Sequence, residues 1–110
     1  MNTIIKKLTG VAPAGVETEL VSDAWPSDSI ICWTHVVCRI VESGAGEPLL
    51  FFKRGDEYYV LGAQEYTIAG DVALFSGMIY LPGDYRPGCR FYNVSSTTDV
   101  EFVAYGFVVE

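Results

Sequence analysis

His35 is the residue on which most candidate catalytic sites in this sequence depend, because it is the only histidine. A Ser-His-Asp or Cys-His site needs a histidine that takes a proton from the nucleophile. His35 falls in the middle of a predicted strand, and no serine stands in a Gly-x-Ser-x-Gly nucleophile turn. The residues therefore favour a packed or interface histidine, and they predict a protein that is not an enzyme.

Fourteen acidic residues leave a glycosidase-type carboxylate pair and a calcium site built from loops as open alternatives. Aspartate is also favoured at turns, because its side chain hydrogen-bonds nearby backbone groups. Four aspartates fall at predicted turns: Asp56, Asp71, Asp84 and Asp99. We therefore interpret them as turn residues and expect no cofactor.

The three cysteines are Cys32, Cys38 and Cys89. Cys32 and Cys38 share one predicted strand, where a spacing of six residues separates their Cα atoms by roughly 20 Å. A disulfide needs a Cα separation below about 7 Å, so these two thiols cannot pair in a continuous strand. With no Cys-x-x-Cys pair, a zinc site is not favoured either. We expect three buried, free thiols.

Aromatic side chains raise the question of sugar binding, because exposed rings stack on sugars as well as filling interfaces. The best candidates are Tyr58 and Tyr59 beside a predicted hairpin tip, and Tyr80 and Tyr85 around Pro82-Gly83. Packing in the core or at an interface is the favoured interpretation of these tyrosines. The tripeptide Arg54-Gly55-Asp56 is interpreted as the hairpin tip, where glycine supplies the backbone freedom that the turn requires.

Short segments with alternating apolar residues, separated by Gly, Pro, Asp and Ser turns, are typical of an all-β sandwich. The alternation predicts eight to nine antiparallel strands and no helix, and an eight-stranded jelly roll fits best. The predicted strands are Val16–Val21, Ile30–Val41, Leu49–Lys53, Tyr58–Leu61, Ala63–Ile68, Val72–Phe75, Met78–Leu81, Cys89–Val94 and Asp99–Val109.

Two of these strands are apolar on both faces, which indicates that one face is covered by a second layer or another subunit. In Ile30–Val41 we expect the even positions to face the core, namely Ile30, Cys32, Thr34, Val36, Cys38 and Ile40. The odd positions and the outer half of the last strand are then left for contact with another copy. The predicted oligomer interface comprises Trp33, Val103, Tyr105, Phe107 and Val109.

The first ten residues differ in charge from the rest of the chain, because they contain two lysines and no acidic residue. We predict that residues 1–15 form an N-terminal arm and that residues 16–110 form the sandwich domain. An arm needed only for solubility would not require two isoleucines. The predicted partner-binding residues are therefore Ile4, Ile5, Lys6, Lys7 and Leu8.

Composition excludes several classes of partner. The net charge of -7 offers no basic stripe for phosphates, so nucleic acid is not an expected partner. The sequence begins without a secretory signal pattern and contains no apolar run long enough for a membrane helix, so we expect synthesis in a cytoplasm and no membrane partner. Hydrophobic residues make up 50% of the chain, which is high for a small domain and indicates subunit interfaces.

The C-terminal third combines Gly77 to Arg86, Val94 to Val100, and Ala104-Tyr105-Gly106. This order of strand, Leu-Pro-Gly-Asp turn, strand, Ser/Thr turn and closing strand resembles the ending of small β-sandwich virion proteins of tailed bacteriophages. The resemblance implies a non-enzymatic structural protein, either a capsid decoration (cement) protein that stabilises the head, which is favoured, or a tail or baseplate module. It implies a homo-oligomer, preferably a trimer, which binds the major capsid protein or other virion subunits and resides in the virion. The alternative is a glycan-binding sandwich of a phage tail tip or a lectin.

Overall fold

The structure is a computed structural model that describes residues 2–61, 67–69 and 71–109. Within these residues the chain forms β-strands and no helix, so none of them belongs to a helix able to span a membrane. The strands are β1 (Asn2–Ala12), β2 (Thr18–Val21), β3 (Ile30–Ile40), β4 (Glu47–Arg54), β5 (Glu57–Val60), β6 (Thr67–Ala69), β7 (Val72–Pro82), β8 (Arg86–Tyr92) and β9 (Thr98–Val109).

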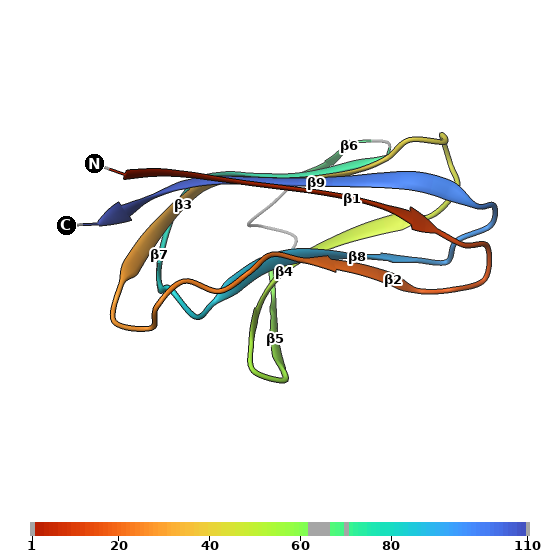
Figure 1. Cartoon of the computed structure of the whole chain (residues 1–110). Helices are drawn as coiled ribbons and strands as arrows, with labels where there is room; N and C mark the ends of the chain where they lie inside the picture. The colour runs from red at the N-terminus through yellow and green to blue at the C-terminus, as the bar shows by residue number, and fades with distance from the viewer. Residues whose placement is uncertain (1, 62–66, 70, 110) are drawn as a thin grey trace.

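The strands form two antiparallel sheets that pack face to face as a sandwich (Figure 1). The five-stranded sheet has the order β1-β9-β3-β7-β6, and the four-stranded sheet has the order β2-β8-β4-β5. The chain passes repeatedly from one sheet to the other, so neighbours within a sheet are mostly distant in sequence. The predicted all-β sandwich of eight to nine antiparallel strands is confirmed.

The hydrophobic core lies between the sheets, where alternate side chains of each strand point inward. The five-stranded sheet contributes Val36 and Phe102, and the four-stranded sheet contributes Leu50 and Phe91, all at most 1% exposed. Burial of each such side chain is worth about 1.5–3 kcal/mol. Cys38 and Cys89 belong to this core as well, and the three cysteines are buried and unpaired, as the sequence predicted.

A β-bulge at Thr34 changes which face of β3 points into the core. The register of β3 against both of its neighbours shifts between Trp33 and His35. One extra residue turns the following side chains to the opposite face of a sheet. The predicted even-numbered core face is therefore wrong for the first half of the strand. The core positions are Ile31 and Trp33 before the bulge, and Val36, Cys38 and Ile40 after it.

The predicted N-terminal arm is wrong, because these residues form strand β1 at the edge of the five-stranded sheet. Eleven residues of β1 pair with β9, from Asn2 opposite Val108 to Ala12 opposite Thr98. The side chain of Ile4 is buried against the domain's own core. The sandwich therefore begins at β1 rather than at residue 16. The charge of this segment suggested an arm, whereas pairing with the distant strand β9 makes it a strand.

Most other strand boundaries lie within two residues of the predicted ones, with three larger differences. The predicted strand Cys89–Val94 is β8 at Arg86–Tyr92, so it begins three residues earlier. The predicted strands Val72–Phe75 and Met78–Leu81 are one continuous strand, β7. The structure has β6 at Thr67–Ala69, whereas residues 63–66 of the predicted strand Ala63–Ile68 lie outside the described residues. The hairpin between β4 and β5 is confirmed: Gly55 has a φ of 57°, which suits the first central position of a type II′ turn.

Candidate functional site

The surface of the five-stranded sheet that points away from the core, called the outer face below, is the first candidate binding surface. Four side chains of β9 predicted for the oligomer interface lie there: Val103, Tyr105, Phe107 and Val109. Tyr105 and Val109 are 39% and 38% exposed, respectively. The structure thus leaves these side chains available, while their contact with another subunit stays a prediction.

Cross-strand register extends this apolar stripe over neighbouring strands. Tyr105 lies between Ile5 of β1 and His35 of β3, and the His35 and Tyr105 rings meet edge to face at 6.3 Å. On β7, alternate residues reach the same face. Apart from Val11 at the far end of β1, the large apolar side chains exposed on the outer face are Ile5, Ile30, Leu74, Met78, Tyr80, Tyr105 and Val109.

The opposite end of the outer face is polar. Arg39 of β3 lies 3.8 Å from Glu101 of β9, and Thr9 of β1 is the neighbour of Glu101 on its other side. Asp99 follows at the end of the strand, opposite Val11. The outer face is therefore divided along its strands into an apolar zone and a charged border.

Cys32 is buried beneath the apolar zone rather than in the core between the sheets. Its neighbours in register are Phe107 of β9 and Tyr80 of β7. A hydrogen bond with the Cys32 thiol raises the pKa of Tyr80. The Tyr80 hydroxyl also donates to the sulfur of Met78 at 3.7 Å. Tyr80 is thus held across the sheet surface by its neighbours.

Trp33, the fifth residue predicted for the oligomer interface, is buried inside the domain, and this prediction is wrong. Only 2% of Trp33 is exposed, and its ring packs against Phe52 of the opposite sheet at 6.3 Å. The bulge at Thr34 accounts for the difference, because it sets the side chains before it in the opposite phase to those after it.

The residues predicted to bind a partner through an arm are separated by the alternation of β1. Ile4 and Leu8 pack against the core, whereas Ile5 and Lys7 lie on the outer face. Of this set, Ile5 is the one apolar side chain available to a partner, as part of the outer face. Docking of a flexible arm is therefore not what this segment does.

Lys6 points toward the interior side of β1, and its ammonium lies 4.3 Å from the centre of the Trp25 ring. A charged side chain directed inward on an edge strand opposes pairing with the edge of another sheet. Trp25 balances part of the cost, because a cation over an aromatic face is attracted by the ring. We interpret Lys6 as protection of the β1 edge rather than as a partner-binding residue.

A cleft between the sheets, called the tyrosine cleft below, is the second candidate binding site. It has a volume of about 630 Å³ and lies between the β4–β5 hairpin and strand β7. Its walls are mostly apolar, and two tyrosines stand among them. The lining residues are Phe52, Tyr59, Val60, Leu61, Phe75, Ser76, Ile79, Leu81 and Tyr85.

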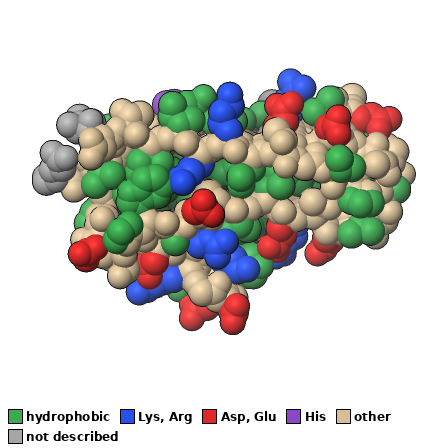
Figure 2. Space-filling view, viewed as in Figure 1, with side chains coloured by type: hydrophobic (Ala, Val, Ile, Leu, Met, Phe, Trp, Pro, Cys, Tyr) green, Lys and Arg blue, Asp and Glu red, His purple; other side chains and the backbone are tan. Residues whose placement is uncertain are grey.

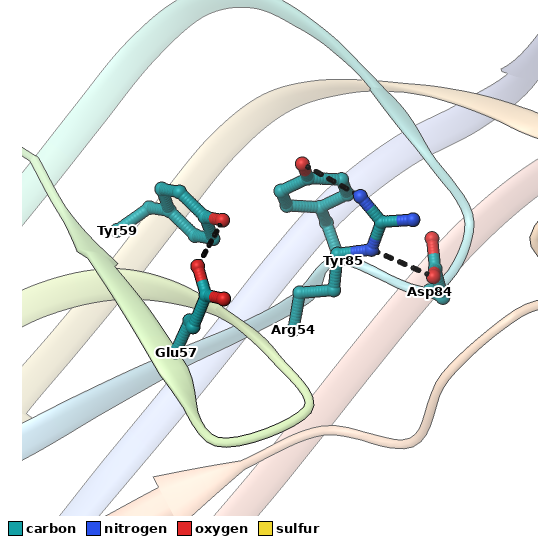
Figure 3. Close-up of polar contacts among 5 residues, drawn as sticks. All are labelled: Arg54, Glu57, Tyr59, Asp84 and Tyr85. Atoms are coloured by element: carbon teal, nitrogen blue, oxygen red, sulfur yellow. Dashed lines mark hydrogen bonds and ion pairs between the residues drawn. The ribbon is translucent and has the colours of Figure 1, made fainter.

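Polar contacts join the two tyrosines to charged neighbours (Figure 3). Arg54 donates from Nε to Asp84 at 3.0 Å and from Nη1 to the Tyr85 hydroxyl at 3.2 Å. The Tyr59 hydroxyl donates to Glu57 at 2.7 Å. The ring centres of Tyr59 and Tyr85 are 5.4 Å apart, and their planes are inclined by 50°.

Arg54 and Glu57, which hydrogen-bond to the two tyrosines, and Asp84, which pairs with Arg54, are called the rim of the cleft below. The hydrogen bond to Glu57, followed by desolvation, raises the pKa of Tyr59 to about 12, so its hydroxyl remains a donor at neutral pH. Hydrogen bonds to Tyr85 and Asp84 raise the pKa of Arg54, which keeps its charge. Tyr59 and Arg54 therefore both present hydrogen-bond donors.

The four tyrosines considered for sugar binding have different surroundings. Tyr59 and Tyr85 meet at the cleft, whereas Tyr80 lies on the outer face. Tyr58 points to the other side of β5, where it packs against Phe51 at 5.0 Å. The alternation of the hairpin, which places Arg54 opposite Glu57 on the side of Tyr59, is the signal that could have indicated the charged part of the rim.

Among the residues that the structure describes, no three His, Cys, Asp or Glu side chains gather as a metal site. No protein-family model matches this chain, and no curated protein matches its sequence. The functional argument therefore rests on the outer face and the tyrosine cleft themselves.

Proposed function

We propose that this protein is a non-enzymatic structural protein that assembles with other subunits through the outer face of its five-stranded sheet. In its specific form the proposal is a decoration protein of a bacteriophage head, oligomeric and bound to the major capsid protein. The observation that carries the proposal is the apolar zone of the outer face, which spans β1, β9, β3 and β7 and has Lys7 and His35 among its apolar side chains.

The exposed apolar side chains of this zone lie on neighbouring strands rather than singly over the surface. Its seven large apolar side chains are between 38% and 66% exposed, and they occupy neighbouring strands of one sheet. Soluble monomers rarely expose contiguous apolar patches larger than a few hundred Å², and larger patches mark interaction sites. The charged border with Arg39 and Glu101 supplies the polar rim that surrounds the centre of such interfaces.

The four-stranded sheet provides an internal comparison, because its own side chains cover Phe51 on its outward side. Phe51 lies under the Tyr58 ring and within 5.9 Å of the Arg90 guanidinium. Arg90 in turn donates to Glu19 at 2.6 Å. Figure 2 shows charged side chains gathered around the β4–β5 hairpin of this sheet. The domain thus covers Phe51 of one sheet, although Tyr58 and Val60 remain 38% and 52% exposed, and leaves the apolar zone of the other sheet uncovered.

The topology supports the virion form of the proposal by analogy of fold. Without β6, each sheet has four strands, in the orders β1-β9-β3-β7 and β2-β8-β4-β5. We assign this arrangement to the jelly roll, an architecture of viral capsid and lectin domains. A fold alone does not define a function. The resemblance of the C-terminal third to small phage virion proteins adds to it, and β9 of that segment carries Tyr105 and Phe107.

Self-association is tested with a matched pair of substitutions on β1. Ile5 in the apolar zone and Val11 at the charged border are both β-branched, point to the same side and are 55% and 54% exposed. Light scattering of the unchanged protein should give a multiple of 12.1 kDa, with the trimer favoured. Ile5→Lys should weaken association at least tenfold, or about 1.4 kcal/mol, because it buries an unpaired charge. Val11→Lys should leave association unchanged.

A monomer at high micromolar concentration, or equal effects of the two substitutions, would refute self-association through the outer face. The virion role has a separate test, in which the protein is mixed with expanded phage capsids and sedimented. Saturable binding that Ile5→Lys abolishes supports a decoration protein. Absence of binding to these capsids refutes the proposal of a capsid decoration role.

A further inference from the structure

We propose that the tyrosine cleft is a carbohydrate-binding site that accepts one neutral sugar unit of a glycan. The inference does not depend on assembly through the outer face, because the two sites use opposite sides of β7. Ile79 and Leu81 line the cleft, whereas Met78 and Tyr80 lie on the outer face. One strand therefore serves both surfaces, and each can be changed separately.

The shape and lining of the cleft suit a small ring. Its volume of about 630 Å³ lies within the range of small-molecule sites, which are concave and mostly apolar with a few polar groups. A sugar ring has apolar C–H faces and a polar edge of hydroxyl groups. The C–H faces match accessible apolar walls such as Val60 and Ile79, while the hydroxyl groups need the polar rim.

The two tyrosines provide the surface on which a sugar ring would rest. Tyr59 comes from β5 and Tyr85 from the turn that leads into β8 of the same sheet (Figure 3). The other sheet contributes Ile79 and Leu81 of β7 to the cleft. Their planes are 50° apart rather than parallel, so the rings form a corner at the cleft. Tyr59 is 43% exposed, which leaves ring surface for contact with a ligand.

The rim provides directional hydrogen bonds. Arg54 has five N–H donors, of which the contacts with Asp84 and Tyr85 use two. Half of the Arg54 side chain remains exposed, so further donors face outward. The guanidinium lies 5.0 Å from the centre of the Tyr85 ring, which holds both groups in place before a ligand arrives. Such preorganisation lowers the entropy lost on binding.

Charge argues for a neutral sugar rather than an acidic one. The rim contains one cation, Arg54, and two carboxylates, Glu57 and Asp84, and the whole chain has a net charge of -7. Arg54 is already paired with Asp84. A carboxylate or sulfate on the ligand would therefore meet net repulsion, whereas neutral hydroxyl groups can donate to the carboxylates and accept from the guanidinium.

The test uses the full chain on an array of immobilised neutral and acidic oligosaccharides, followed by titration with free methyl glycosides of glucose, galactose, mannose and N-acetylglucosamine. The array and the free glycosides distinguish a site for surface glycans from a site for free sugars. We expect a neutral oligosaccharide to bind. Tyr59→Ala and Arg54→Met should each weaken its binding at least tenfold.

Tyr58→Ala is the matched control, because Tyr58 is the next residue on β5 and points away from the cleft. It should leave sugar binding unchanged, as should Ile5→Lys on the outer face. Circular dichroism of each variant verifies folding before binding is compared. Binding of acidic glycans alone, binding of an apolar dye without any sugar, absence of binding, or equal losses in Tyr58→Ala and Tyr59→Ala would each overturn the proposal.

Discussion

The ammonium of Lys6 lies 4.3 Å from the centre of the Trp25 ring, which joins the first strand to the loop after the second. Trp25 also donates its backbone N–H to the carbonyl of Gly83 at 2.9 Å. Lys6 is therefore part of the sandwich edge rather than of a solvated tail. Lys7, the next residue, lies exposed on the outer face, so the two lysines have different surroundings despite identical chemistry.

This difference predicts unequal effects of neutralising the two lysines. Lys6→Gln should reduce the free energy of unfolding by about 0.5–1 kcal/mol, because it removes the cation from the aromatic face. Lys7→Gln should change it by less than about 0.5 kcal/mol, as is usual for surface positions. Urea denaturation followed by tryptophan fluorescence measures both. Equal effects would show that the contact with Trp25 contributes nothing.

A second prediction separates a strand from an arm. Ile4→Ala should destabilise the domain by about 2–5 kcal/mol, because Ile4 is only 3% exposed and its truncation leaves a cavity. Ile5→Ala, at a site that is 55% exposed, is the control and should change the free energy of unfolding of the monomer by less than about 0.5 kcal/mol. If Ile4→Ala were also neutral in urea denaturation, β1 would not be packed as described.

A third prediction concerns alkaline pH. Burial, followed by a hydrogen bond with Cys38, raises the pKa of Cys89 far above its ordinary value of 9.0. Above about pH 9 the unfolded chain loses this proton and the folded chain keeps it, so stability should fall as pH rises. The fall from this thiol should approach about 1.4 kcal/mol per pH unit. The free energy of unfolding of Cys89→Ala should fall less steeply between pH 9 and 10.5, and parallel curves would exclude Cys89 as the cause.

A fourth prediction concerns the bulge. Deletion of Thr34 should prevent folding. Without the extra residue, either Ile31 and Trp33 point away from the core or the residues after the bulge lose their register with β9. Thr34→Ala keeps the extra residue and loses the hydrogen bond from Oγ1 to the carbonyl of Tyr105 and the contact between Oγ1 and His35 Nδ1. It should cost about 0.5–1.5 kcal/mol. Circular dichroism and thermal melting of the two variants provide the comparison, and a folded deletion variant would contradict the role of the bulge.

The sequence by itself determined the features that depend on neighbouring residues. Alternating apolar residues gave the all-β class, and the glycine of Arg54-Gly55-Asp56 marked the hairpin tip. The same alternation put Tyr105 and Phe107 on the side of β9 opposite the core residue Phe102. These features were predictable because a strand's period and a turn's backbone requirements are set within a few residues.

Tertiary structure decided the features that depend on a partner strand far away in the chain. β1 is a strand because it pairs with the edge of β9. The face of β3 on which Trp33 lies depends on the bulge at Thr34, where β3 has one residue more than β9. Tyr59 and Tyr85 meet because β5 and β8 pair with opposite sides of β4, whose register places Tyr59 beside Phe52 and the start of β8 beside Lys53. Register between distant strands is fixed by the burial of a whole face at once, so no local pattern contains it.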